Sequence, residues 1–327
     1  MSCGELNTRT HLTHGFERSF KLVIPCNASD STRIVVLIHC YGCDASFMVN
    51  KMLNLLHDVV LVAPEGIGRS FNGITCCGKA LAQNIDDVGF VSSIVSQVKT
   101  ELSNDAQVSV VGFSNGAYLT SLIASSEENQ WVSSMILVSG FVPMVIPSRP
   151  LPVLILHGTF DEHLPWQGCC ASHICCCNIP SENNHCDSVV DLFSRWNTVN
   201  GCQSVIEIAN QREMDVAQIV EVPAEGACYR GATCATNLCL FEGGHTFDPS
   251  SMMRDFIFSE MIHESAHPSK ENISPPNERV TPFKEDVTST GYYTYVPLVL
   301  LAMVLVYRLT KISFWLNYRR LAGDEIA

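Results

Sequence analysis

The stretch VSVVGFSNGA at residues 108–117 decides the fold class of this chain. A short valine-rich run enters a Gly-x-Ser-x-Gly pattern and a helix-permissive segment follows, which predicts a strand, a sharp turn and a helix. Gly112 and Gly116 are small enough to let the strand and the helix close around Ser114. The helix N-terminus would direct N–H groups at a developing oxyanion. Ser114 is therefore the candidate nucleophile, and a glycine-flanked surface turn is the alternative.

A nucleophilic serine needs a histidine as general base and a carboxylate that orients the histidine. In hydrolases built on this turn, the acid follows the serine along the chain and the histidine comes last. The apolar run 152–157 predicts a buried strand, and Asp161 follows it in a loop. His245 lies on a glycine-rich turn after a short strand predicted at 238–241. His157 is a rival base, but its place at a strand end favours a structural role in holding the acid loop. The alternative for Asp161 is turn capping.

Segments along the chain resemble the polyhydroxybutyrate depolymerase and feruloyl esterase-like family of secreted α/β-hydrolases. The resemblance is carried by VAPEGIGRSFN at 62–72, CCG at 76–78, IDDVGF at 85–90, HGTFD at 157–161, Trp196 with NGC at 200–202, and EGGHT at 242–246. It implies an α/β-hydrolase fold and the catalytic triad Ser114, Asp161 and His245. It also implies a carboxylic ester hydrolase that requires no cofactor and no metal.

The expected oxyanion loop departs from the family pattern. A predicted strand leads into HCYGC at 39–43, where relatives commonly read His-Gly-x-Gly. Turn geometry assigns the N–H of Asn115 as one oxyanion donor, and the resemblance assigns the N–H of Tyr41 as the other. Cys40 would strain the loop if that position requires a positive φ. Phe247 replaces a tryptophan of the family pattern, which could alter the acyl pocket.

Strands alternating with helices predict an α/β fold with a mainly parallel sheet and helices on both faces. We expect strands at 19–25, 33–39, 59–63, 135–139, 152–157, near 204–209 and 217–222, and at 238–241, and helices at 45–57, 86–102, 187–200 and 250–262. Asp86 and Asp87 are expected to be charges at a helix start, without a catalytic role. The net charge of −13 argues against a nucleic-acid partner.

The sixteen cysteines indicate disulfides and an oxidising compartment. Six of them crowd into a Cys-rich insertion at about 167–187, where a hydrolase places a lid or a substrate-binding segment. Nearby histidines raise the alternative of a metal site, but zinc-type cysteine spacing is absent there, which favours disulfides or lipid-modified thiols. Cys40 and Cys43 do have the two-residue spacing of cysteine pairs that bind zinc, but we expect them to form disulfides. The sequons at Asn27 and Asn272 fit a lumenal or extracellular glycoprotein.

The C-terminal part predicts a membrane anchor. Residues 264–287 are polar and rich in proline, which is typical of a disordered stalk. Residues 288–310 predict a single transmembrane helix, because about 20 apolar helical residues span roughly 30 Å. The basic start of the tail 311–327 places the tail in the cytosol and the hydrolase, 1–263, outside or in a lumen. No apolar signal segment is visible in 1–13, so a tail-anchored protein with a cytosolic hydrolase is the alternative.

These observations favour a membrane-anchored serine carboxylic ester hydrolase. Its partners would be the membrane, through the C-terminal helix, and a small ester or oligoester of the hydroxyalkanoate or aromatic acyl (feruloyl-like) type. A catalytically inactive hydrolase-fold module for binding or adhesion is one alternative, which Cys40 in the oxyanion loop favours. A peptidase or thioesterase of the same fold is the other.

Overall fold

The computed structural model describes residues 3–13, 15–102, 105–142, 145–168, 187–219 and 223–259. All of them belong to one compact unit, 1–265. The predicted stalk 264–287, the predicted transmembrane helix 288–310 and the tail 311–327 lie outside the described residues, as does most of the Cys-rich insertion. Among the described residues, none of the helices is both long and apolar enough to cross a bilayer.

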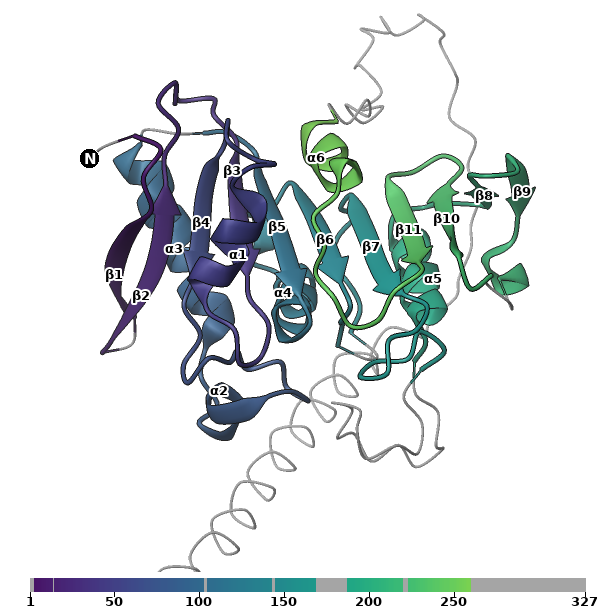
Figure 1. Cartoon of the computed structure of the whole chain (residues 1–327), viewed down its shortest axis with the longest axis horizontal. Helices are drawn as coiled ribbons and strands as arrows, with labels where there is room; N and C mark the ends of the chain where they lie inside the picture. The colour runs from purple at the N-terminus through teal and green to yellow at the C-terminus, as the bar shows by residue number, and fades with distance from the viewer. Residues whose placement is uncertain are drawn as a thin grey trace, which may run out of the picture. The chain divides into compact units, whose positions relative to one another are not determined.

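Within the described ranges, eleven strands form one sheet in the order β1-β2-β4-β3-β5-β6-β7-β11-β10-β8-β9 (Figure 1). The strands are β1 (Asn7–Thr13), β2 (Phe16–Val23), β3 (Ile34–Ile38), β4 (Val60–Pro64), β5 (Val108–Phe113), β6 (Ser134–Val138), β7 (Val153–Gly158), β8 (Val205–Glu207), β9 (Arg212–Met214), β10 (Gly226–Gly231) and β11 (Thr236–Phe241). The central strands from β4 to β11 pair in parallel. The strands outside them pair antiparallel, so the expected mainly parallel sheet is parallel only in its centre.

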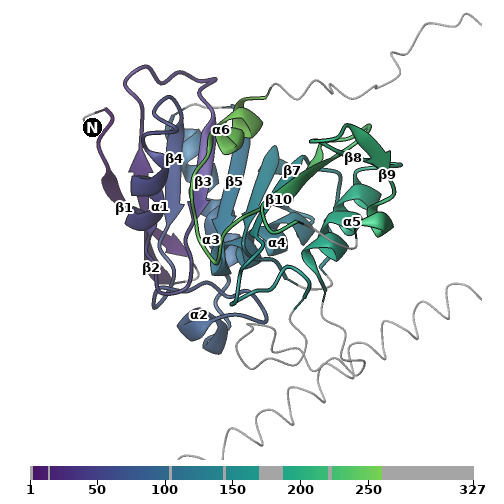
Figure 2. The same ribbon diagram turned by 45° about the vertical axis from the view of Figure 1, so that its right-hand side comes forward.

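Helices cover both faces of this sheet (Figures 1 and 2). The face-covering helices are α1 (Ala45–Met52), α3 (Asp87–Glu101), α4 (Asn115–Ser125), α5 (Val189–Val199) and α6 (Ser251–Phe258). The short helix α2 (Gly78–Ala82) lies below the edge of the sheet in Figure 1, and η1 (Asn129–Trp131) and η2 (Val216–Gln218) are short 3₁₀ turns. Alternate residues of β3 face opposite sides of the sheet and belong to different apolar clusters. Ile34 and Val36 pack in the cluster with α3, α4 and α5, whereas Val35 and Leu37 pack in the cluster with α1 and α6. Burial on both faces explains why the central strands are continuous apolar runs.

The segment after α5 corrects one expectation. A strand was expected near 217–222, but Val216–Gln218 forms the 3₁₀ turn η2, while 220–222 lie outside the described residues. The side chain of Asp215 accepts the N–H of Ala217, and Gln218 accepts the N–H of Asp215 in return. These local hydrogen bonds satisfy the backbone without a ladder, so the segment leaves the extended conformation.

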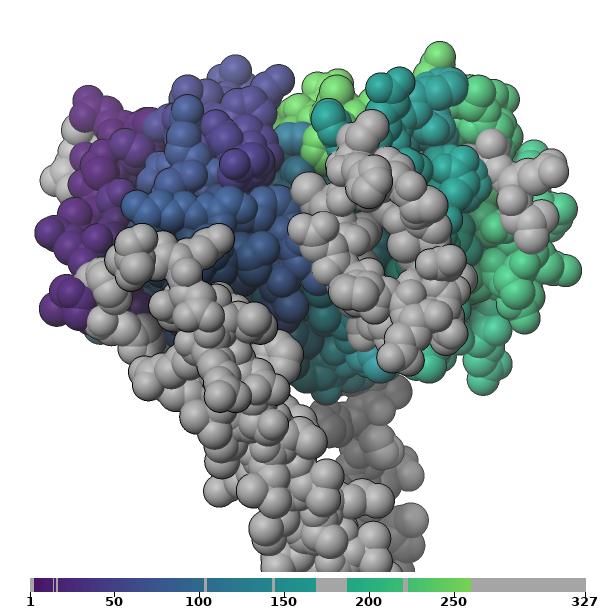
Figure 3. Space-filling view, turned by 90° about the horizontal axis from the view of Figure 1, so that it is seen from below, coloured from purple at the N-terminus to yellow at the C-terminus, as the bar shows by residue number. Residues whose placement is uncertain are grey.

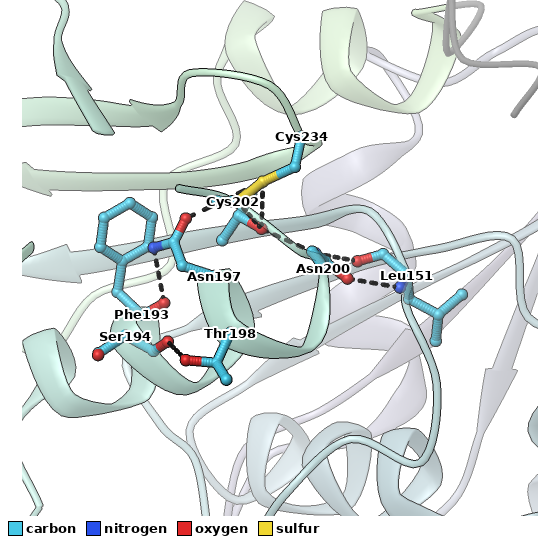
Figure 4. Close-up of a disulfide and its surroundings, with 9 residues drawn as sticks. Leu151, Phe193, Ser194, Asn197, Thr198, Asn200, Cys202 and Cys234 are labelled. Carbon is cyan, nitrogen blue, oxygen red and sulfur yellow. Dashed lines mark hydrogen bonds between the residues drawn. A yellow bond between two sulfur atoms is a disulfide. The ribbon is translucent and has the colours of Figure 1, made fainter. Parts of the chain in front are cut away.

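Disulfides join neighbouring segments, and the pairs among the described residues are Cys3–Cys26, Cys40–Cys43, Cys76–Cys77, Cys202–Cys234 and Cys228–Cys239. Figure 4 shows Cys202–Cys234, which ties the end of α5 to the β10–β11 turn. Beside it, the Asn200 side chain bonds the backbone N–H and carbonyl of Leu151. The end of α5 is thus fixed to the residues that lead into β7, the strand before the acid loop.

The loops that leave β3, β5, β6, β7 and β11 emerge at the carboxyl edge of the parallel strands. Ligands of open α/β sheets bind at this edge. Figure 3 views the molecule from this side, with the β1–β2 hairpin and β9 at opposite ends. The residues expected to form the site all follow strands that end here.

Candidate active site

Ser114 occupies the sharp turn between β5 and α4. Its φ of 54° and ψ of −118° lie in a region that non-glycine residues rarely adopt. The turn is possible because its neighbours lack side chains: a Cβ on Gly112 would collide with Thr120 and the Gly116 carbonyl. A Cβ on Gly116 would collide with the Ile38 carbonyl oxygen in β3. The Gly-x-Ser-x-Gly pattern therefore reflects close backbone approach on both sides of the serine.

A hydrogen-bonded chain connects the three residues expected to form a triad. Ser114 Oγ lies 2.8 Å from His245 Nε2, and His245 Nδ1 lies 2.8 Å from Asp161 Oδ2. Carboxylates accept only, so Nδ1 carries the proton and Nε2 is free to accept the serine hydroxyl. Serine, histidine and aspartate follow β5, β11 and β7 respectively, and the strand order brings their loops together. This arrangement is suited to acyl transfer.

The acid loop holds Asp161 as an acceptor. Its Oδ1 accepts the backbone N–H groups of His163 at 3.0 Å and Leu164 at 2.8 Å. Burial by itself raises the pKa of Asp161, but the hydrogen bonds from His245 and Leu164 outweigh it and lower the pKa overall. Asp161 is therefore ionised at neutral pH and can stabilise a protonated His245.

His157, the rival base, lies behind this carboxylate. It is 1% exposed, and its Nε2 lies 2.6 Å from the carbonyl oxygen of Leu164 and 3.5 Å from Asp161 Oδ2. A carbonyl only accepts, so Nε2 bears the proton. Burial lowers the pKa of His157, which keeps the ring neutral. The structure places Ser114 beside His245, and His157 holds the acid loop.

The histidine turn is tied to the acid loop by backbone contacts. The N–H of Phe160 donates to the carbonyl of Gly243, and a Cβ on Gly158 would collide with the carbonyls of Gly243 and Gly244. Phe247 is buried and stacks against Phe113 at 5.4 Å, so it supports the turn from the core. An influence of Phe247 on an acyl pocket stays a prediction.

The loop after β3 is organised by a buried histidine. The N–H of Gly66 donates to His39 Nε2 at 3.0 Å, so the proton lies on Nδ1, which donates to the Cys40 carbonyl at 2.8 Å. Burial lowers the pKa of His39 to about 4, and the ring is neutral at physiological pH. In this loop the residue with a positive φ is Gly42, at 77°. Cys40 therefore does not carry the strain that its replacement of glycine could have caused.

Tyr41 and Asn115 differ in their surroundings. Tyr41 is 58% exposed, whereas Asn115 is fully buried and its side chain bonds the backbone of Phe71 and Cys76. Because Asn115 is the first residue of α4, its N–H has no carbonyl one turn earlier to bond within the helix. Tyr41 N–H and Asn115 N–H stay the proposed oxyanion donors.

Gly140, after β6, is a site residue that sequence reasoning missed. A Cβ there would lie 2.5 Å from the carbonyl oxygen of Ser114 and 3.1 Å from its Cα. Only the strand pairing of β5 with β6 brings the two together. Among the described residues, no group of three or more His, Cys, Asp and Glu side chains could hold a metal ion.

One solved structure shares this architecture. An acetyl xylan esterase from Aspergillus awamori superposes with a TM-score of 0.51 at 12% identity, over 76% of this chain and 97% of that chain. The chain has the α/β-hydrolase fold. A poly(3-hydroxybutyrate) depolymerase, LpqC from Bordetella parapertussis, gives a TM-score of 0.41 at 15% identity, over 55% of this chain and 71% of its own. A thermostable esterase gives 0.39 at 18% identity over 50% of this chain, which spans about half, 48%, of that esterase. No protein-family model and no curated protein matches the sequence.

Proposed function

We propose that this chain is a serine carboxylic ester hydrolase. The observation that carries the proposal is the hydrogen-bonded chain from Ser114 through His245 to Asp161, at the turn after the central strand β5. The α/β-hydrolase fold supports it, because hydrolases of this fold carry their nucleophile at this turn. An inactive binding module would have no need for a serine held in a rarely adopted conformation within hydrogen-bonding distance of a histidine nitrogen.

The geometry suggests the course of the reaction. Ser114 Oγ attacks the ester carbonyl while His245 Nε2 takes its proton, and Asp161 stabilises the imidazolium. The N–H groups of Asn115 and Tyr41 hold the tetrahedral oxyanion, and the α4 dipole adds to their field. His245 then protonates the leaving alcohol. Water, activated by the same histidine, hydrolyses the acyl-enzyme.

The proposed substrate is a small ester or oligoester of the hydroxyalkanoate or aromatic acyl type. Support comes from the sequence segments that resemble polyhydroxybutyrate depolymerases and feruloyl esterases. The Aspergillus neighbour is named for acetyl xylan, which adds acetyl esters of sugars to the substrates worth testing. A peptide or thioester substrate is an outcome that the same assays would reveal.

We further propose that the enzyme is anchored in a membrane by 288–310, with the hydrolase domain outside the cytosol. The disulfides of the domain support an oxidising compartment. Asn27, in the sequon after Cys26, is exposed and accessible to glycosylation. A cytosolic, tail-anchored orientation would leave Asn27 unglycosylated, so its modification in cells distinguishes the two.

The activity is tested with the full-length chain, produced in an oxidising host and purified in detergent. Nitrophenyl acetate, butyrate and hydroxybutyrate and methyl ferulate, each offered to wild type and to Ser114→Ala, cover the proposed substrate classes. Hydrolysis by the wild type that disappears in the variant supports the esterase. A folded wild type that hydrolyses none of these esters favours the binding-module alternative.

A further inference from the structure

Two disulfides of this domain close short loops, and each loop contacts a residue that follows Ser114: Cys76 contacts Asn115, and His39, next to Cys40, approaches Gly116. Cys40–Cys43 spans three residues and Cys76–Cys77 joins adjacent residues. The other disulfides of the described ranges, by contrast, span 11 to 32 residues. In the chain-entropy account, a crosslink restricts the unfolded chain less when its loop is shorter. The two short crosslinks are therefore poorly placed to stabilise the whole fold, and a local role is expected.

The first short disulfide encloses the peptide that would supply one oxyanion donor. The Cys40 carbonyl and the Tyr41 N–H belong to the same planar peptide unit, so fixing one fixes the direction of the other. That carbonyl accepts His39 Nδ1–H at 2.8 Å and the Cys43 N–H at 3.2 Å. The next peptide is held as well, since the Gly42 N–H donates to the Arg69 carbonyl at 2.8 Å. Cys40–Cys43 keeps the two ends of this tight loop together.

The second short disulfide supports the residue that would supply the other donor. Asn115 Nδ2 donates to the carbonyls of Phe71 at 2.9 Å and Cys76 at 3.1 Å, and its Oδ1 accepts the Phe71 N–H at 2.7 Å. The first residue of α4 is thereby attached to the loop that Cys76–Cys77 closes. Movement of that loop would pull directly on Asn115.

The two crosslinked loops also touch each other. Gly78 follows Cys77, and a Cβ on Gly78 would lie 2.6 Å from Tyr41 Cε2. The tyrosine ring thus packs against the backbone next to the second disulfide. Both expected oxyanion donors, Tyr41 and Asn115, are in this way held by one small unit that contains both short crosslinks.

We infer that Cys40–Cys43 and Cys76–Cys77 are positioning crosslinks of the oxyanion hole, so that the catalytic rate depends on both being oxidised while the fold does not. The inference rests on the proposed esterase activity. A donor displaced by about 1 Å stabilises the charge of the transition state much less, and such displacements lower the rate by a factor on the order of 100. Ground-state ester binding does not use these donors fully, so KM should change little.

The test compares three double variants of the full-length chain: Cys40→Ser/Cys43→Ser, Cys76→Ser/Cys77→Ser, and the control Cys3→Ser/Cys26→Ser. The control disulfide lies on the exposed N-terminal segment and closes a longer loop. We expect each site variant to lose kcat by about 10- to 100-fold with KM nearly unchanged. Its affinity for phenylboronic acid, which forms a tetrahedral adduct with the serine, should fall in parallel. The control should keep kcat and show the larger drop in urea midpoint.

Reduction of the wild type gives an independent measurement if a variant fails to fold. A water-soluble phosphine supplies two electrons per disulfide and becomes its oxide with oxygen from water, and each disulfide takes up two protons to become two thiols. Iodoacetamide mapping would show when the 40–43 and 76–77 pairs are open, and reoxidation should restore kcat. Unchanged kcat in the site variants, or a loss matched by the control, overturns the inference alone. A wild type inert towards every ester overturns the proposed function, and the inference falls with it.

Discussion

His157 donates its Nε2–H to the backbone carbonyl of Leu164 at 2.6 Å, directly behind Asp161. The N–H of the same Leu164 donates to Asp161 Oδ1 at 2.8 Å, so one buried histidine sets the loop that orients the carboxylate. His157 and Asp161 are only four residues apart, yet their roles differ because one ends a strand and the other lies in the loop after it.

Replacing His157 by Asn should weaken both stability and catalysis. The variant leaves the Leu164 carbonyl without its donor in a buried site, and such a loss costs roughly 1–3 kcal/mol of unfolding free energy. We expect kcat to fall by about 10-fold because Asp161 is held less firmly. Urea titration and nitrophenyl ester kinetics measure the two effects. His57→Asn, at an exposed position, is the matched control and should change neither.

Replacing Asp161 by Asn should reduce kcat by roughly 10⁴-fold, as expected when a triad loses the carboxylate that fixes the histidine tautomer. The amide can donate a hydrogen bond to His245 Nδ1, which would place the histidine proton on Nε2 and remove the acceptor for Ser114. The KM should change far less than kcat. A variant that retains more than a tenth of the wild-type kcat would show that Asp161 is not the orienting acid.

The stability of the domain should fall as the pH is lowered below 6.5, because of His39. Burial lowers its pKa in the folded protein from 6.5 to about 4. Between pH 6.5 and 4 the unfolded chain binds a proton at this histidine that the folded chain does not. The free energy of unfolding therefore decreases as the pH is lowered, by roughly 3 kcal/mol in total. The slope should flatten below about pH 4. Urea midpoints from about pH 3 to 7 test this, and His39→Gln should remove this part of the pH dependence.

Gly140→Ala should damage the nucleophile without touching a catalytic side chain. The added Cβ would meet the Ser114 carbonyl oxygen at 2.5 Å, so the turn must shift. We expect the rate of labelling by a fluorophosphonate to fall by at least 10-fold, since the alignment of Ser114 with His245 depends on that turn. A folded Gly140→Ala variant that is labelled as fast as the wild type would show that the turn tolerates the displacement.

The sequence predicted the centre of this fold because the signals there are local. The β5–α4 turn, the strand before Asp161 and the glycine-rich turn at His245 each follow from residues close in the chain. Their assembly follows from the parallel order of the strands. The antiparallel edges were harder to predict, since β8 and β9 have three residues each and β1 has a polar, half-buried pattern.

Interactions between distant segments could not be read from the sequence. Asp86 behaves as expected and accepts the Gly89 N–H at the start of α3. Asp87 is also a charge at the start of α3, as expected, but its burial (2% exposed) and its ion pair with buried Arg18 of β2 at 2.7 Å were not predicted. Burial raises the pKa of Asp87 despite this arginine. Gly140 and His39 were missed for the same reason, because Ser114 and Gly66, which they contact, lie in loops that follow other strands.

Fluorophosphonate labelling of the full-length chain, beside Ser114→Ala and His245→Ala, measures whether Ser114 is an activated nucleophile. The proposed triad predicts a single labelled site at Ser114, absent from the serine variant and labelled orders of magnitude more slowly in the histidine variant, because Nε2 of His245 activates the hydroxyl 2.8 Å away. A folded wild-type protein that takes up no label, or takes it up at another residue, would contradict it.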